Sequence, residues 1–152
     1  MRGRRARAPL LGLAGVLLAA AACGPGDDGV DLPPLEPTFF SLDANVFGPR
    51  CTGPCHSGGE EFAAGGLDME PDARLALLDV LADSTKCRDS GLTLLVEGEP
   101  EASLAYLKVR AKREDTEPPC GDPMPPGSSR APLTVAQVEA LRAWIEAGAP
   151  AD

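Results

Sequence analysis

The residues of this chain with the greatest chemical potential gather in one short segment, Cys51-Thr52-Gly53-Pro54-Cys55-His56. Two thiols stand close together in sequence, and an imidazole follows the second thiol directly. A pair of thiols can add across the two vinyl groups of a porphyrin, and an adjacent imidazole can then reach the iron. The segment therefore predicts covalent attachment of one haem through Cys51 and Cys55, with His56 as the proximal iron ligand.

The spacing of the two thiols differs from the usual haem-attachment pattern. That pattern is C-x-x-C-H, whereas this chain has C-x-x-x-C-H. Gly53 and Pro54 favour a tight turn that can absorb the additional residue. The juxtaposition of Cys55 and His56, which sets the ligand geometry, is unchanged, and His56 is the only histidine of the chain. We therefore expect attachment in spite of the longer gap.

A second axial ligand to the iron would have to be a methionine, because the chain has no second histidine. Met69 and Met124 are the only methionines after the first residue. Met124 lies in the proline-rich run 123–126, where a restricted backbone leaves little entropy to lose on ligation. Met69 would have to swing to the opposite haem face soon after His56, and a role as a core filler suits it better. We expect Met124 as the sixth ligand, with Met69 as the alternative.

Residues 1–22 have the organisation of an export signal. Four arginines precede an uncharged apolar run over residues 10–22, which is too short to span a bilayer. The run ends in small residues, Ala20, Ala21 and Ala22, directly before Cys23, a sequence that resembles the lipobox of a bacterial lipoprotein. That resemblance implies lipidation of the Cys23 thiol and cleavage before it. The alternative is an ordinary signal peptide with a cysteine nearby.

Residues 23–38 are rich in proline, glycine and acid and predict a lipidated cysteine followed by a flexible tether. Acyl chains on Cys23 would hold the protein on the bilayer without a transmembrane helix. We expect an extracytoplasmic location on a bacterial membrane, at the outer membrane or the periplasmic face. Removal of residues 1–22 changes the net charge from −9 to −13. A chain this acidic is not expected to bind nucleic acid.

The number of cysteines is odd, at five, which requires an explanation in an exported protein. Lipidation would use Cys23 and haem attachment would use Cys51 and Cys55. By elimination, Cys87 and Cys120 would pair as a disulfide. Such a bond closes a loop of about 33 residues and would contribute roughly 3–4 kcal/mol in the chain-entropy model. It would also anchor the start of the Met124 loop.

Apolar spacing and capping residues predict four short helices in the remaining chain. The first has Ser41 as its N-cap and ends at Pro49, and the last begins with a capping box of Thr134 and Gln137. The second carries Leu75, Leu78 and Leu81/Ala82 at helical intervals, and the third carries Leu104, Leu107 and Ala111 on one face. The apolar stripe of the last helix consists of Val135, Val138, Leu141, Trp144 and Ile145. A short extended segment is expected between them. The expected ranges are 41–48, 71–82, a helix from Pro100 through Ala111, 134–148, and the extended segment 92–96.

These segments together resemble a small mono-haem c-type cytochrome domain of bacterial exported lipoproteins. The resemblance spans residues 39–149 and depends on five stretches, which are 51–59, 66–68, 96–104, 124–126 and 133–149. It implies an all-α, cytochrome c-like bundle of short helices around the haem, in which the first and last helices cross. We assign residues 39–152 to this domain.

The function expected from these features is transfer of single electrons to redox partner proteins through a transient interface, without catalysis of bond chemistry by this chain. The main alternative is a disulfide-stapled surface lipoprotein that acts as a binding or structural module. In that alternative Cys51 and Cys55 would also form a bridge, and His56 would have no role. A zinc site built from cysteine and histidine is a third hypothesis, which an oxidising compartment disfavours.

Overall fold

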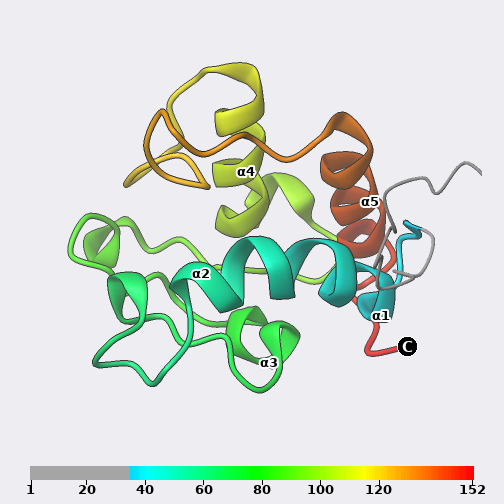
Figure 1. Ribbon diagram of the computed structural model, residues 1–152, viewed down its shortest axis with the longest axis horizontal. Coiled ribbons are helices and arrows are strands. Elements are labelled where there is room, and N and C mark those ends of the chain that lie inside the picture. The colour runs from blue at the N-terminus through cyan, green and yellow to red at the C-terminus, as the bar shows by residue number, and fades with distance from the viewer. Residues whose placement is uncertain (1–34) are drawn as a thin grey trace, which may run out of the picture. The chain divides into compact units, whose positions relative to one another are not determined.

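The computed structural model describes residues 35–152, so the signal peptide, Cys23 and most of the tether lie outside the described residues. The described chain consists of short helices joined by long loops (Figure 1). Within these residues there is no β-sheet, only single β-bridges between extended segments. The all-α prediction is confirmed at this level. No helix in residues 35–152 is long and apolar enough to cross a membrane.

One helical stretch near the start of the described residues leads directly to Cys51 and Cys55. Its N-cap is Thr38, whose hydroxyl accepts a hydrogen bond from the Ser41 N–H at 3.2 Å. The prediction of Ser41 as N-cap is therefore wrong, and Ser41 lies buried in the first turn. The stretch comprises α1 (Phe39–Leu42), the π-helix η1 (Asp43–Thr52) and α2 (Gly53–Cys55).

The predicted end of this first helix at Pro49 is also wrong, because the helical backbone continues through the proline. In an α-helix the proline ring collides with the carbonyl one turn earlier. The wider turn of a π-helix changes the hydrogen-bonding register and relieves that conflict. The Gly53 N–H, for example, bonds back to the carbonyl of Gly48 rather than to a residue one position closer. The π-helical turn thereby extends the helix to the cysteine segment.

The second predicted helix is much shorter than expected, because α3 spans only Ala73–Leu77. Its backbone leaves the helix at Leu78, and Asp79 adopts a left-handed conformation with φ of 54°. The following residues instead pair with the extended segment 92–96, where the Asp79 N–H donates to the Leu95 carbonyl at 2.9 Å. Tertiary pairing thus overrides the helical apolar spacing. Leu75, which was expected on the apolar face, is 65% exposed.

The helices after this segment agree more closely with their predictions. α4 (Leu104–Glu114) buries Leu104, Leu107 and Ala111 as expected. Pro100 lies in a separate turn before it, so the helix begins four residues later than predicted. Within residues 35–152 the short 3-10 helices are η2 (Ala64–Gly66), η3 (Arg88–Ser90) and η4 (Pro100–Ala102).

The last helix, α5 (Val135–Glu146), begins with the predicted capping box. The Thr134 hydroxyl accepts from the Gln137 N–H at 3.2 Å, and the Gln137 side chain accepts from the Thr134 N–H at 2.9 Å. Val135 was expected on the buried stripe but is half exposed, since it lies in the first turn beside solvent. The rest of the stripe is buried as predicted and consists of Val138, Leu141, Trp144 and Ile145.

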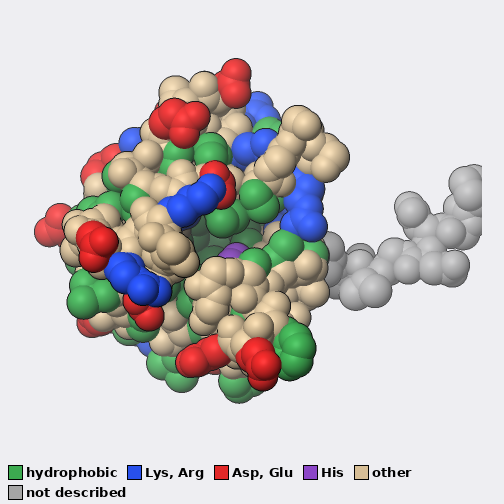
Figure 2. All heavy atoms as spheres, turned by 90° about the vertical axis from the view of Figure 1, so that its left-hand side faces the viewer, with side chains coloured by type: hydrophobic (Ala, Val, Ile, Leu, Met, Phe, Trp, Pro, Cys, Tyr) green, Lys and Arg blue, Asp and Glu red, His purple; other side chains and the backbone are tan. Residues whose placement is uncertain are grey.

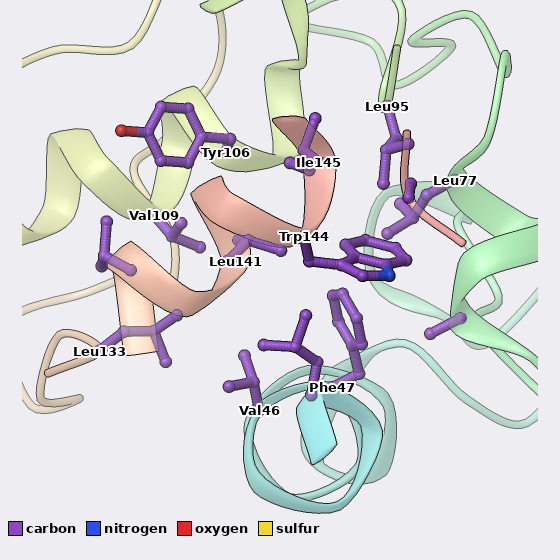
Figure 3. Packing of buried hydrophobic residues seen from close by; sticks show 14 of the residues in the cluster. Val46, Phe47, Leu77, Leu95, Tyr106, Val109, Leu133, Leu141, Trp144 and Ile145 are labelled. Atoms are coloured by element: carbon purple, nitrogen blue, oxygen red, sulfur yellow. The ribbon is translucent and has the colours of Figure 1, made fainter. Parts of the chain in front are cut away.

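Trp144 is the centre of the core and joins the first helical stretch to the last helix (Figure 3). Its side chain is fully buried. It stacks on Phe39 with ring centroids 6.0 Å apart and meets the edge of Phe47 at 5.9 Å. Its indole N–H donates to the Pro150 carbonyl at 2.9 Å. The first and last helices of the described region are therefore in direct contact.

A further contact joins the two ends of the described chain. The carboxylate of Asp152 accepts hydrogen bonds from the backbone N–H groups of Phe39, at 2.8 Å, and Phe40. These N–H groups lie in the first turn of α1, where an α-helix has no internal acceptors for them. A negative charge at this position is also favourable toward the helix dipole. Asp152 therefore stabilises the start of the helical stretch that carries the cysteines.

Candidate functional site

Cys51 and Cys55 lie at the C-terminal end of the first helical stretch, on η1 and α2 respectively. Residues four positions apart are neighbours on one face of a helical turn. The three-residue gap is thus compatible with two thiols presented side by side, because the backbone between them is helical rather than a tight turn. Both thiols are half-buried, and neither takes part in a disulfide.

The two thiols differ in their electrostatic surroundings. Burial raises the pKa of Cys51 to about 11, and the neighbouring Cys55 contributes to the rise while Arg50 opposes it. Cys55 instead has a cationic partner, since the Arg130 guanidinium donates to its Sγ atom at 2.6 Å. The Cys51 thiol is therefore held neutral at ordinary pH, whereas the Cys55 sulfur lies next to a fixed positive charge.

His56 follows α2 directly, and its ring is held by a backbone carbonyl. The Nδ1 atom lies 3.0 Å from the carbonyl oxygen of Leu67. Because a carbonyl can only accept, Nδ1 carries the proton in this contact, and the lone pair of the neutral ring is on Nε2. A metal-binding histidine is typically oriented by this kind of bond from its other ring nitrogen. The His56 ring thus has the tautomer that a metal ligand requires.

The loop after His56 folds back so that the Leu67 carbonyl can reach the ring. The Met69 N–H donates to the His56 carbonyl at 2.9 Å. The Asp68 carboxylate accepts from the Gly59 N–H at 2.7 Å. Gly59 has φ of 90°, a conformation that is costly for residues with a side chain. These contacts bring the end of the stretch 51–59 to the stretch 66–68, and both stretches carry the sequence resemblance.

The surface above His56 is hollowed. Figure 2 shows the face on which the histidine is visible, at the floor of a depression that is lined by hydrophobic side chains. Arginine and lysine side chains stand near its rim in the same view. An apolar recess with an oriented imidazole at its floor suits a flat apolar group with a metal at its centre. The recess therefore offers apolar surface and an imidazole nitrogen at one place.

Met124 lies on the loop that follows α4. Its N–H donates to the carbonyl of Lys108 at 3.0 Å, and its side chain is half-buried against the main core cluster. The same loop continues to the cysteine segment, where Arg130 contacts Cys55 and the Ala131 carbonyl accepts from Arg50 at 2.6 Å. The loop thus connects α4 to the helical stretch that carries the thiols.

Met69, the alternative ligand, is 4% exposed and belongs to the core cluster. It also borders a cavity of about 540 Å³ whose lining includes neither cysteine nor His56. The other lining residues are Asp43, Gly48, Thr52, Glu70 and Pro71. The position of Met69 is therefore that of a packing residue.

The structure joins Cys87 and Cys120 by a disulfide with a Cα–Cα distance of 5.4 Å. Cys87 is buried in a second, smaller core cluster together with Ala82 and Leu104. The bond therefore ties the start of the Met124 loop to the interior of the protein. Among residues 35–152 there is no group of three or more histidine, cysteine or acidic side chains arranged to hold a metal ion.

Three participants in this site were not predicted from the sequence: the Leu67 carbonyl, Lys108 and Arg130. A backbone carbonyl has no sequence signal at all. Arg130 lies in a loop without periodicity, and nothing in its neighbours indicates a contact with Cys55. Lys108 lies on a predicted helix, but its reach into the Met124 loop depends on how that loop folds.

No protein-family model, no curated protein and no solved structure matches this chain.

Proposed function

We propose that this protein is an electron carrier with one covalently attached c-type haem. Cys51 and Cys55 would form the two thioethers, and His56 and Met124 would be the axial iron ligands. When bound, such a haem supplies reversible one-electron chemistry at its iron. The chain itself would then bind and orient the haem, and no residue of it would catalyse bond chemistry.

The observation that carries this proposal is the orientation of His56. Its Nδ1 atom is used by the Leu67 carbonyl at 3.0 Å, which leaves Nε2 as the ligand atom. The ring lies at the floor of an apolar hollow (Figure 2) and directly follows a cysteine that is not disulfide-bonded. A histidine without a function would not require this combination of tautomer, recess and adjacent thiol.

The remaining parts of the proposal concern location and partners. Lipidation of Cys23 would anchor the protein to a bacterial membrane on its extracytoplasmic side, at the outer membrane or the periplasmic face. The net charge of −13 after removal of residues 1–22 favours redox partners with a basic docking face. Association with such partners would be transient and would weaken as salt screens the charges.

The reduction potential would depend on two opposing features of the chain. The Met124 thioether favours the ferrous state and raises the potential. The acidic surface favours the more positive ferric state and lowers it. Because salt screens the surface charges far more than a directly bound ligand, the thioether is expected to dominate.

The test is expression with a cytochrome c maturation system, followed by denaturation, haem staining and a pyridine haemochrome spectrum. We expect one haem per chain to remain after denaturation. The double variant C51S/C55S should retain none, while each single variant should give the spectrum of a haem with one thioether. The matched control C87S/C120S removes two cysteines elsewhere and should retain haem. A colourless wild-type protein with a Cys51–Cys55 bridge would refute the proposal and support the disulfide-stapled alternative.

A further inference from the structure

Lys108 makes an unusual set of contacts with the loop that carries Met124. It lies on α4 and is half-buried. Its Nζ atom donates to the Cys120 carbonyl at 2.8 Å and to the Asp122 carbonyl at 3.0 Å. Its own carbonyl accepts from the Met124 N–H at 3.0 Å. Lys108 therefore contacts the loop backbone at three residues, which are Cys120, Asp122 and Met124.

The ammonium group is closely packed against the backbone of this loop. Gly121 has φ of 65°, and a Cβ atom placed there would lie 2.6 Å from the Lys108 Nζ atom. The same Cβ would lie 3.2 Å from the Cys87 sulfur. The lysine therefore reaches a position that only a glycine leaves accessible, directly beside the disulfide. The contact therefore depends on two features, the long Lys108 side chain on α4 and the absence of a side chain at Gly121 in the loop.

A second lysine contacts the same loop in a different way and provides a control. Lys86 pairs with the Asp122 carboxylate at 2.7 Å, and both side chains are more than half exposed. An exposed pair of this kind contributes little to stability. Lys86 touches only the side chain of Asp122, whereas Lys108 holds backbone carbonyls. Substitution of either lysine removes one positive charge, but only substitution of Lys108 removes hydrogen bonds to the loop backbone.

We propose that Lys108 is the positioning residue for Met124 and that it presents the thioether to the iron by fixing the loop backbone. This inference rests on the proposed function. Groups that hold a ligand from behind orient it and strengthen its bond to the metal. A thioether is a weak ligand on a flexible side chain, so a fixed backbone reduces the entropy that ligation costs.

The experiment compares K108M with K86M in the full-length protein, both loaded with haem and free of haem. Methionine keeps most of the apolar stem of lysine and removes its three N–H donors. The first readout is the long-wavelength sulfur-to-iron charge-transfer band, which reports the Met124 bond. The second is hydrogen exchange at the Met124 amide in haem-free protein. We expect K108M to lose the band and to exchange about tenfold faster or more, because charge-assisted hydrogen bonds are lost. K86M should keep the wild-type band and exchange rate.

The outcomes separate this inference from the proposed function. A K108M protein with the wild-type band and wild-type exchange would overturn the role of Lys108 while leaving haem binding intact. Haem retained in wild-type protein without the band would refute Met124 as ligand and this inference with it. Wild-type protein without haem would refute both proposals. If K108M does not fold, K108Q replaces it. Glutamine is shorter and neutral, so a weakened band is expected, and an undiminished band would overturn the inference.

Discussion

The buried thiol of Cys51 gives a quantitative prediction about reactivity in the haem-free protein. Burial raises its pKa from 9.0 to about 11. Thiolate, not thiol, reacts with alkylating reagents. At pH 8 the thiolate fraction is then about one in a thousand, against about one in ten for the ordinary pKa. We expect Cys51 to be alkylated about 100-fold more slowly in the folded protein than in the unfolded chain.

The assay is alkylation with iodoacetamide at pH 7 to 10, quenched at intervals and read for each cysteine by peptide mass spectrometry. The protein is produced without haem-maturation proteins, and the unfolded reference is the same protein in guanidinium chloride. The variant C55S serves as a control that removes the neighbouring thiol and its contribution to the Cys51 pKa. Equal rates in folded and unfolded protein, or a pH profile with a midpoint near 9 in both, would refute the argument.

The same pKa shift has a consequence for stability. The folded state binds the Cys51 proton more tightly than the unfolded state, because the folded pKa is the higher one. This contribution is therefore fully present below pH 9 and is lost as the pH rises toward 11. The variant C51S should lack that part of the pH dependence of the unfolding free energy, measured by urea denaturation between pH 8 and 11.

Three further predictions concern the scaffold. Replacement of Cys87 and Cys120 by serine should lower the free energy of unfolding by about 4 kcal/mol, because the disulfide closes a long loop. Urea denaturation of the haem-free protein measures this change. A reducing agent should destabilise the wild type but not the variant. Trp144→Ala should cost about 3–5 kcal/mol because a fully buried aromatic side chain is lost, whereas Phe62→Ala, at a side chain 78% exposed, should leave the thermal midpoint nearly unchanged. Thr134→Ala should cost about 1 kcal/mol through loss of the capping hydrogen bond, and an unchanged urea midpoint would contradict the role of the box.

The parts of the fold that could be predicted from the sequence are those specified by local interactions. The capping box of Thr134 and Gln137 and the buried stripe of α5 depend on residues within one helix, and both are present. The helix over Leu104–Glu114 follows the same rule. In contrast, α3 ends early because residues 79–82 pair with a distant extended segment. The helical spacing of the leucines around Leu75 does not indicate whether these residues will continue the helix or pair with the extended segment.

The first helical stretch shows a second limit of local reasoning. Pro49 ordinarily stops a helix, and the sequence gives no sign that a π-helical turn will carry the chain past it. Within the site, the proximity of Cys51, Cys55 and His56 follows from their adjacency in sequence. The partners that orient them do not, because the Leu67 carbonyl and Arg130 reach the site only through the folding of two loops.

The contact of Asp152 with the N–H groups of Phe39 and Phe40 bears on how the molecule can be handled in the laboratory. It places residue 152 beside the first turn of α1, on the right in Figure 1, whereas the histidine is visible from the opposite side in Figure 2. A fluorophore or surface linker grafted after residue 152 would leave the protein beside the first turn of α1. Immobilised in that way, the protein would keep its histidine face turned toward the solution.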